Sequence, residues 1–223
     1  MDKLLISFWV FDLIFLATGT LMVVVAVMVK KEMAAGMTID NVASGLLLNH
    51  APLTGALANG GVVFATFLLS IPGVMLPLTR NWLRLHGWAV VACAIFTLVV
   101  GLDVWFKTLK TRSMLSTMWG EHSAVTQSLL QQRFDCCGYL DAATPPFQKD
   151  SVCPNALVAA QKLGCVGAFS DFANTYLNRV FTASFGIVTL DVILLLHVAM
   201  LLKERREKHR YRHIDSKTGL RAI

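Results

Sequence analysis

The chain has 223 residues, 55% of which are hydrophobic, and it carries a formal net charge of +6. The apolar residues are concentrated in four blocks of at least 20 residues, each with at most one Asp, Glu, Lys or Arg, whereas a soluble helix of that length would carry a polar stripe. Because a bilayer core of about 30 Å is spanned by about 20 helical residues, the composition excludes a single soluble globular domain and predicts four transmembrane helices.

The first apolar block covers residues 4–29 and follows a short N-terminal segment, residues 1–3. Its one charged residue is Asp12. A small loop, residues 30–55, comes next, and its second half contains three consecutive leucines at positions 46–48. Three exposed leucines are unexpected on a free loop, so we expect this loop to pack under the larger loop that comes later in the chain.

The second and third blocks cover residues 56–79 and 87–106, and a short connection, residues 80–86, joins them. Cys93 lies in the middle of the third block, where we expect a small packing residue. Asp103 lies near the outer end of the same block. We expect its side chain to reach the interface between lipid and water.

The longest hydrophilic segment, residues 107–179, separates the third and fourth blocks. Its first part, residues 107–133, contains no proline and predicts one helix that continues the third span. Its last part, residues 166–179, predicts a helix that leads into the fourth span. The middle part, residues 136–165, is rich in turn residues and too small to form a hydrophobic core by itself, a situation in which disulfides are the usual remedy.

The fourth block covers residues 180–202, and a tail, residues 203–223, follows it with eight basic and three acidic residues. The segment 107–179 is nearly balanced, with seven basic and five acidic residues. Basic residues near span ends favour the cytoplasmic side. We therefore expect both termini and the connection 80–86 in the cytoplasm, and the loops 30–55 and 107–179 outside. The positive charge indicates membrane orientation, and we expect no nucleic-acid partner.

Four of the five cysteines, Cys136, Cys137, Cys153 and Cys165, lie in the large external segment. An even number of cysteines in an oxidising compartment predicts a disulfide framework. Of the three possible connectivities, the one that joins the neighbours Cys136 and Cys137 would be strained, which leaves two. A zinc site is disfavoured, because neighbouring residues cannot easily supply two ligands and no Cys-x-x-Cys spacing is present.

The order of spans and loops, together with residues 132–139 (Gln-Arg-Phe-Asp-Cys-Cys-Gly-Tyr), resembles the tetraspanin family. The hallmark of that family is a Cys-Cys-Gly motif shortly after the third span, followed by further cysteines in the same loop. Cys153 and Cys165 match those later cysteines in order and rough spacing. The first span is also similar, although the family usually has Asn in the place of Asp12. The resemblance covers residues 4–202.

The resemblance implies an all-α, integral membrane bundle of four transmembrane helices with a disulfide-stabilised, helical large extracellular loop. It also implies the pairs Cys136–Cys165 and Cys137–Cys153, with Gly138 completing the family motif. Residues 139–164 would then form a variable head that binds partners. The residues that we predict to contact partners in this head are Tyr139, Phe147, Asn155 and Leu157.

Asp12, Asp191 and His197 are the polar residues expected inside the membrane spans. A carboxylate in hydrocarbon costs several kcal/mol unless it is neutralised or partnered. We expect these three side chains to share a polar patch that faces the interior of the bundle. The patch is either a structural hydrogen-bonded cluster or, as the family fold permits, the lining of a cavity that holds a sterol or another lipid polar group.

The resemblance implies a non-enzymatic membrane organiser or scaffold. Such a protein associates laterally with other integral membrane proteins, including further copies of itself, and binds partners through its large loop. The sequence contains no metal-spaced His cluster, Gly-rich phosphate loop or nucleophile elbow, so we predict no catalytic residues, metal or cofactor. The alternative is a small transporter or channel that uses Asp12, Asp191 and His197. We expect a multi-pass protein of the plasma membrane or the endosomal system.

Overall fold

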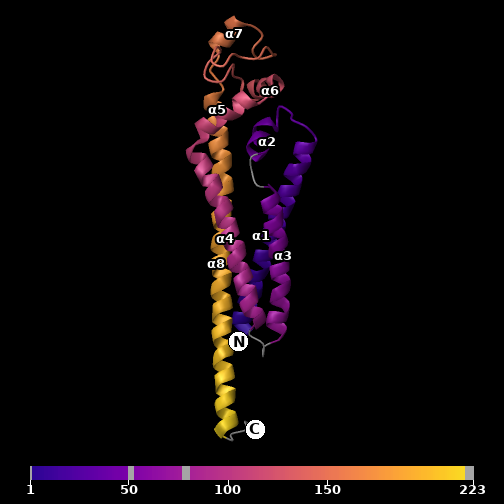
Figure 1. Cartoon of the computed structure of the whole chain (residues 1–223), viewed down its shortest axis with the longest axis vertical. Coiled ribbons are helices and arrows are strands. Elements are labelled where there is room, and N and C mark those ends of the chain that lie inside the picture. The colour runs from indigo at the N-terminus through magenta and orange to yellow at the C-terminus, as the bar shows by residue number, and fades with distance from the viewer. Residues whose placement is uncertain (1, 50–52, 77–80, 219–223) are drawn as a thin grey trace. The chain divides into compact units, whose positions relative to one another are not determined.

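The computed structural model describes residues 2–49, 53–76 and 81–218, and this part of the chain contains helices and no strand. The predicted all-α fold class is therefore confirmed. The helices, labelled in Figure 1, are α1 (Asp2–Ala34), α2 (Val42–Asn49), α3 (Leu53–Met75), α4 (Asn81–Leu109), α5 (Thr111–Glu121), α6 (Ala124–Phe134), α7 (Ala156–Gln161) and α8 (Val166–Thr218).

Four of these helices, α1, α3, α4 and α8, are long and apolar enough to cross a membrane. They contain the four apolar blocks recognised in the sequence, which confirms a multi-pass membrane protein. Residues 77–79, at the end of the second block, and residue 80 lie outside the described residues. The helix expected over residues 166–179 is the beginning of α8, which runs without interruption into the fourth span.

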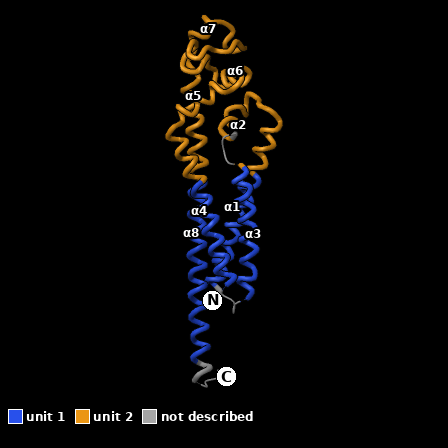
Figure 2. Tube along the Cα trace, in the orientation of Figure 1, with its two compact units in different colours: residues 1–24, 54–99, 184–223 blue, residues 25–53, 100–183 orange. Residues whose placement is uncertain are grey.

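The chain forms two compact units, and the first contains residues 1–24, 54–99 and 184–223 (Figure 2, blue). Glycines let α1 and α3 approach closely here. A Cβ atom added at Gly19 would lie 2.4 Å from a methyl group of Val63, and one added at Gly60 would lie 2.4 Å from Val23. The buried core of this unit consists of Phe8, Phe15, Val63, Leu83, Val90, Cys93, Leu194, Val198 and Leu201.

The expected connection between the second and third spans is largely helical, because α4 begins at Asn81. Leu83, His86 and Val90 are fully buried. Their spacing of three and four residues places them on one face of α4. This face continues the apolar stripe of the third span toward the start of the helix, so His86 belongs to the interior of the first unit.

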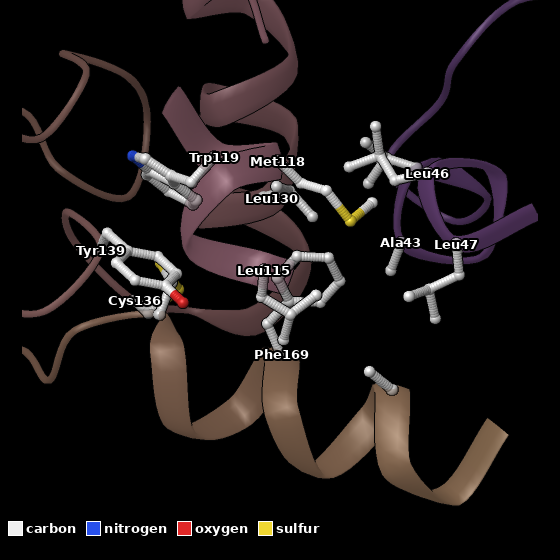
Figure 3. Close-up of a cluster of buried hydrophobic side chains, with 13 residues drawn as sticks. Ala43, Leu46, Leu47, Leu115, Met118, Trp119, Leu130, Cys136, Tyr139 and Phe169 are labelled. Atoms are coloured by element: carbon white, nitrogen blue, oxygen red, sulfur yellow. A yellow bond between two sulfur atoms is a disulfide. The ribbon is translucent and has the colours of Figure 1, made fainter. Parts of the chain in front are cut away.

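The second unit contains residues 25–53 and 100–183 (Figure 2, orange). Its core joins α2 of the small loop to the large loop, as Figure 3 shows for Leu46 and Leu47 facing Met118 and Leu115. Leu46 is 1% exposed and Leu47 is 6% exposed. The expectation that the leucine triplet packs under the large loop is therefore confirmed for these two residues.

The single helix predicted over residues 107–133 is wrong, since the structure divides this segment among the end of α4, α5 and α6. After α5 the backbone at His122 becomes extended, with φ −93° and ψ 151°. The side-chain Nε2 of Gln127 donates to the backbone carbonyls of Trp119, at 2.8 Å, and His122, at 3.3 Å. These bonds satisfy carbonyls that a continuing helix would have bonded, so the side chain of Gln127 compensates for the break.

Candidate functional site

The head of the large loop is fixed by two disulfides, Cys136–Cys165 and Cys137–Cys153. This is the pairing that the family resemblance implied. Between them, Gly138 has a φ of +72°, and a Cβ atom there would lie 2.0 Å from the carbonyl oxygen of Asp141. Both the backbone conformation and the lack of space require glycine, which gives the third position of the Cys-Cys-Gly motif a physical reason.

Gln131 connects the two sides of this head, and the sequence had given no sign of its role. It is fully buried at the end of α6. Its Nε2 donates to the Gln148 carbonyl and to Asp150 Oδ2, each at 2.7 Å, while its Oε1 accepts from Gln148 N at 2.9 Å and Gly138 N at 3.3 Å. The carboxamide of Gln131 therefore links the turn at Gly138 to the segment 148–150.

The four residues predicted to bind partners differ in exposure, and Tyr139 is a correction. Tyr139 is 3% exposed, its ring packs 5.5 Å from that of Trp119, and its hydroxyl donates to the Arg112 carbonyl at 3.1 Å. Burial raises the pKa of this phenol. Tyr139 therefore belongs to the core of the second unit, because its amphipathic ring fills the space beneath the motif turn while its hydroxyl satisfies a backbone group.

Phe147 is half-buried against the cluster around the Cys137–Cys153 disulfide, so it supports the head from within. Asn155 is exposed, but its side chain accepts a hydrogen bond from Val158 N at 2.9 Å and so caps α7. Leu157, on α7, is 80% exposed. Leu163, which did not stand out in the sequence, is 87% exposed. Of the predicted residues, Leu157 is therefore the one whose large apolar side chain is exposed to solvent.

In the first unit, the carboxylate of Asp12 joins α1 to α3 and α4. Its Oδ2 accepts from Ser70 Oγ at 2.6 Å, and its Oδ1 lies 3.5 Å from His86 Nε2. His86 Nδ1 lies 3.0 Å from the carbonyl oxygen of Thr66. Since a carbonyl oxygen only accepts, Nδ1 carries a proton, and Nε2 is the nitrogen that faces Asp12. Asp12 and His86 are both fully buried.

Asp12, Asp191 and His197 were expected to share a polar patch, but no hydrogen bond or ion pair found among the described residues joins any two of these three side chains. His197 Nε2 lies 2.8 Å from Ser7 Oγ, and its ring packs 4.7 Å from that of Phe11. Asp191 is 1% exposed, and its Oδ1 has no hydrogen-bond partner in the described part of the chain. Ser70 and His86 were not predicted from the sequence, although the apolar i, i+3, i+7 spacing around His86 was a signal that could have revealed it.

Two further polar contacts lie in the same unit. Asn59 Nδ2 donates to Thr97 Oγ1 at 2.9 Å, which ties α3 to α4. Thr66 Oγ1 lies 3.9 Å from the Cys93 thiol. Within the described residues, no group of three or more His, Cys, Asp or Glu side chains lies close enough to hold a metal ion.

No protein family, no curated protein and no solved structure matches this chain in the comparisons with known proteins.

Proposed function

We propose that this protein is a non-enzymatic, tetraspanin-like membrane organiser that binds partners through the head of its large extracellular loop. It associates laterally with other integral membrane proteins, including its own copies, in the plasma membrane or the endosomal system. Both termini lie in the cytoplasm. The tail with its excess of basic residues and the two disulfides, which form in oxidising compartments, support this orientation.

The observation that carries the proposal is the division of roles within the head. The two disulfides and Gln131 hold its interior, whereas Leu157 and Leu163 leave their apolar side chains in water. Exposing a large apolar side chain gains nothing for folding, whereas burying it against a partner removes apolar surface from water and stabilises the complex by about 25 cal/mol per Å². A rigid head that presents such residues also loses little conformational entropy on binding.

The test replaces both exposed leucines in the full chain, as Leu157→Asp/Leu163→Asp, and identifies neighbours by cell-surface cross-linking. We expect the double variant to lose the neighbours that depend on the loop while it keeps its disulfides and its membrane insertion. Val125→Asp is the matched control, because Val125 is 70% exposed on α6, outside the head. An unchanged set of neighbours in the double variant would place the recognition surface elsewhere.

The alternative function, a transporter or channel that uses Asp12, Asp191 and His197, is tested by ion flux in proteoliposomes. We expect no flux above that of empty vesicles. A sterol near Asp191 is a separate proposal, supported by the buried carboxylate oxygen without a partner among the described residues. A photoreactive sterol should label the wild-type protein more strongly than the Asp191→Leu variant.

A further inference from the structure

Beyond the proposed spans, α8 continues as a helix to Thr218, as Figure 1 shows for the end of the chain that is coloured yellow. Lys203, Arg206 and Arg210 lie three and four residues apart, and this spacing places them on one face of the helix. They line an open groove together with Glu207, His209 and His213. We refer to Lys203, Arg206 and Arg210 as the basic stripe.

The acidic side chains near the stripe are too few to balance its positive charge. Glu204 accepts from Lys208 Nζ at 2.8 Å, so that pair is balanced and lies outside the groove. Glu207 is the one acidic residue among the groove-lining side chains. The groove therefore contains one acidic residue and the three basic residues of the stripe, and a polyanion complements this excess of positive charge.

The rotation of the stripe about the helix axis is fixed by Arg205. Its Nη1 donates to the Gly73 carbonyl at the end of α3, at 2.6 Å. Within a helix that carbonyl would accept from the residue four positions later, which in this sequence is Pro77 and has no N–H. Arg205 thus satisfies an acceptor that the backbone cannot, and the contact ties α8 to α3 within the first unit. Because this contact fixes the rotation of α8, the face that carries Lys203, Arg206 and Arg210 keeps a constant direction relative to α3.

We propose that the basic stripe binds the phosphate groups of an anionic phospholipid headgroup. Lys203 follows the fourth span directly, and at about 1.5 Å per residue Arg210 starts about 12 Å beyond Leu202. The headgroup layer is roughly 5–8 Å thick on each side of the bilayer. Side chains lean toward the N-terminus of their helix, which for α8 is the side of the membrane, so all three basic groups reach back toward this layer.

A headgroup with several phosphates fits the stripe better than one with a single phosphate. Arg206 and Arg210 are four residues apart, which puts their Cβ atoms about 6 Å from each other. Two arginines at such neighbouring positions can each form paired hydrogen bonds to a phosphate through the guanidinium group. The position of the stripe beside the span favours lipid over a cytosolic acidic protein, which would have to displace headgroups in order to reach Lys203.

The test measures binding of a fluorescent, short-chain phosphatidylinositol bisphosphate to the purified full chain in phosphatidylcholine nanodiscs. For Arg206→Gln/Arg210→Gln we expect about 30-fold weaker binding, at roughly fivefold per basic residue near the surface. Lys208→Gln/Arg212→Gln removes the same formal charge outside the stripe, and we expect it to bind within about threefold of wild type. Glutamine keeps the helix propensity, and circular dichroism checks the fold of both variants.

Each other outcome would overturn the inference in a distinct way. Equal loss in the two double variants would indicate diffuse charge attraction, and no loss in either would exclude the stripe as the site. Equal binding to phosphatidylserine at the same total charge would remove the role of the phosphates. Equal affinity for soluble inositol trisphosphate would indicate a free polyphosphate, and equal affinity for an acidic helical peptide would indicate a protein partner. The stripe belongs to the cytoplasmic tail of the proposed function, but nanodiscs expose both faces and contain no partner protein, so the two proposals can fail separately.

Discussion

Replacing Gln131 by Leu should loosen the head of the large loop without removing either disulfide. The substitution leaves the N–H of Gly138 and both backbone groups of Gln148 without the carboxamide that they contact at 2.7–3.3 Å. Asp150 retains Ser128 Oγ at 3.0 Å, so it contributes less to the loss. At about 1 kcal/mol for each unsatisfied buried group, the head should lose about 3 kcal/mol of stability.

Hydrogen exchange on the full chain in nanodiscs can measure this loss locally. The amides of Cys137 and Cys165, which donate to Leu163 O at 3.1 Å and Gly138 O at 3.0 Å, keep their acceptors in the Gln131→Leu variant and so report opening of the head. A loss of about 3 kcal/mol should speed their exchange by about 100-fold, since each 1.4 kcal/mol corresponds to a factor of ten.

The neighbouring Gln132 supplies the control, because its amide donates to Ser128 Oγ at 3.1 Å and the residue is half-buried. Gln132→Leu should cost about 0.5 kcal/mol. Gln131→Glu keeps the shape but brings a second carboxylate to Asp150, and we expect exchange at least as fast as in Gln131→Leu. If Gln131→Leu and Gln132→Leu exchange at the same rate, the reasoning about the buried carboxamide is refuted.

Three further perturbations test other parts of the molecule. Cys137→Ser removes the disulfide to Cys153 and should cost the head about 2–5 kcal/mol, read from the same exchange experiment; wild-type protection would contradict this. Burial raises the pKa of Tyr139, so its contribution to stability is complete below about pH 10, the ordinary value for tyrosine, and is lost as the pH rises through the folded-state pKa. Near-UV circular dichroism between about pH 8 and about pH 12 should show this loss, less steeply in Tyr139→Phe. Asp12→Leu should lower thermal stability, and Asp12→Leu/His86→Leu should recover part of it, as for other buried pairs; strictly additive losses would show that the two side chains are not coupled.

The spans and the packing of the small loop could be predicted because both follow from apolar surface. A block of about 20 apolar residues with at most one charge and no polar stripe is typical of a membrane span. Leu46 and Leu47 needed apolar neighbours, which the large loop provides in the same unit. The head was harder to predict. Tyr139 was predicted to contact partners because it lies in the expected head, residues 139–164. Whether its amphipathic ring points inward depends on the space beneath the motif turn, and sequence spacing does not encode that space.

The helix break near His122 was missed for a related reason. Residues 107–133 lack proline, so local propensity favours one helix, and propensity is a weak constraint that tertiary contacts override. In the structure, the side-chain Nε2 of Gln127 donates hydrogen bonds to the backbone carbonyls of Trp119 and His122. The chain can therefore turn, and Trp119 and Leu130, on opposite sides of the turn, both enter the core.

The polar residues of the first unit make most sense as pairwise ties between helices. Helices in lipid gain little from hydrophobic association, because lipid tails are as apolar as Leu, and interhelical hydrogen bonds of about 0.6–2 kcal/mol help to select neighbours. Asp12 contacts Ser70 of α3 and faces His86 of α4, while His197 of α8 contacts Ser7 of α1. Residues that looked like one site in the sequence are thus distributed among several helix pairs. Asp191 differs from Asp12, whose Oδ1 at least lies 3.5 Å from His86 Nε2, because the buried Oδ1 of Asp191 has no hydrogen-bond partner among the described residues. A search for a bound lipid in this unit should therefore begin at Asp191.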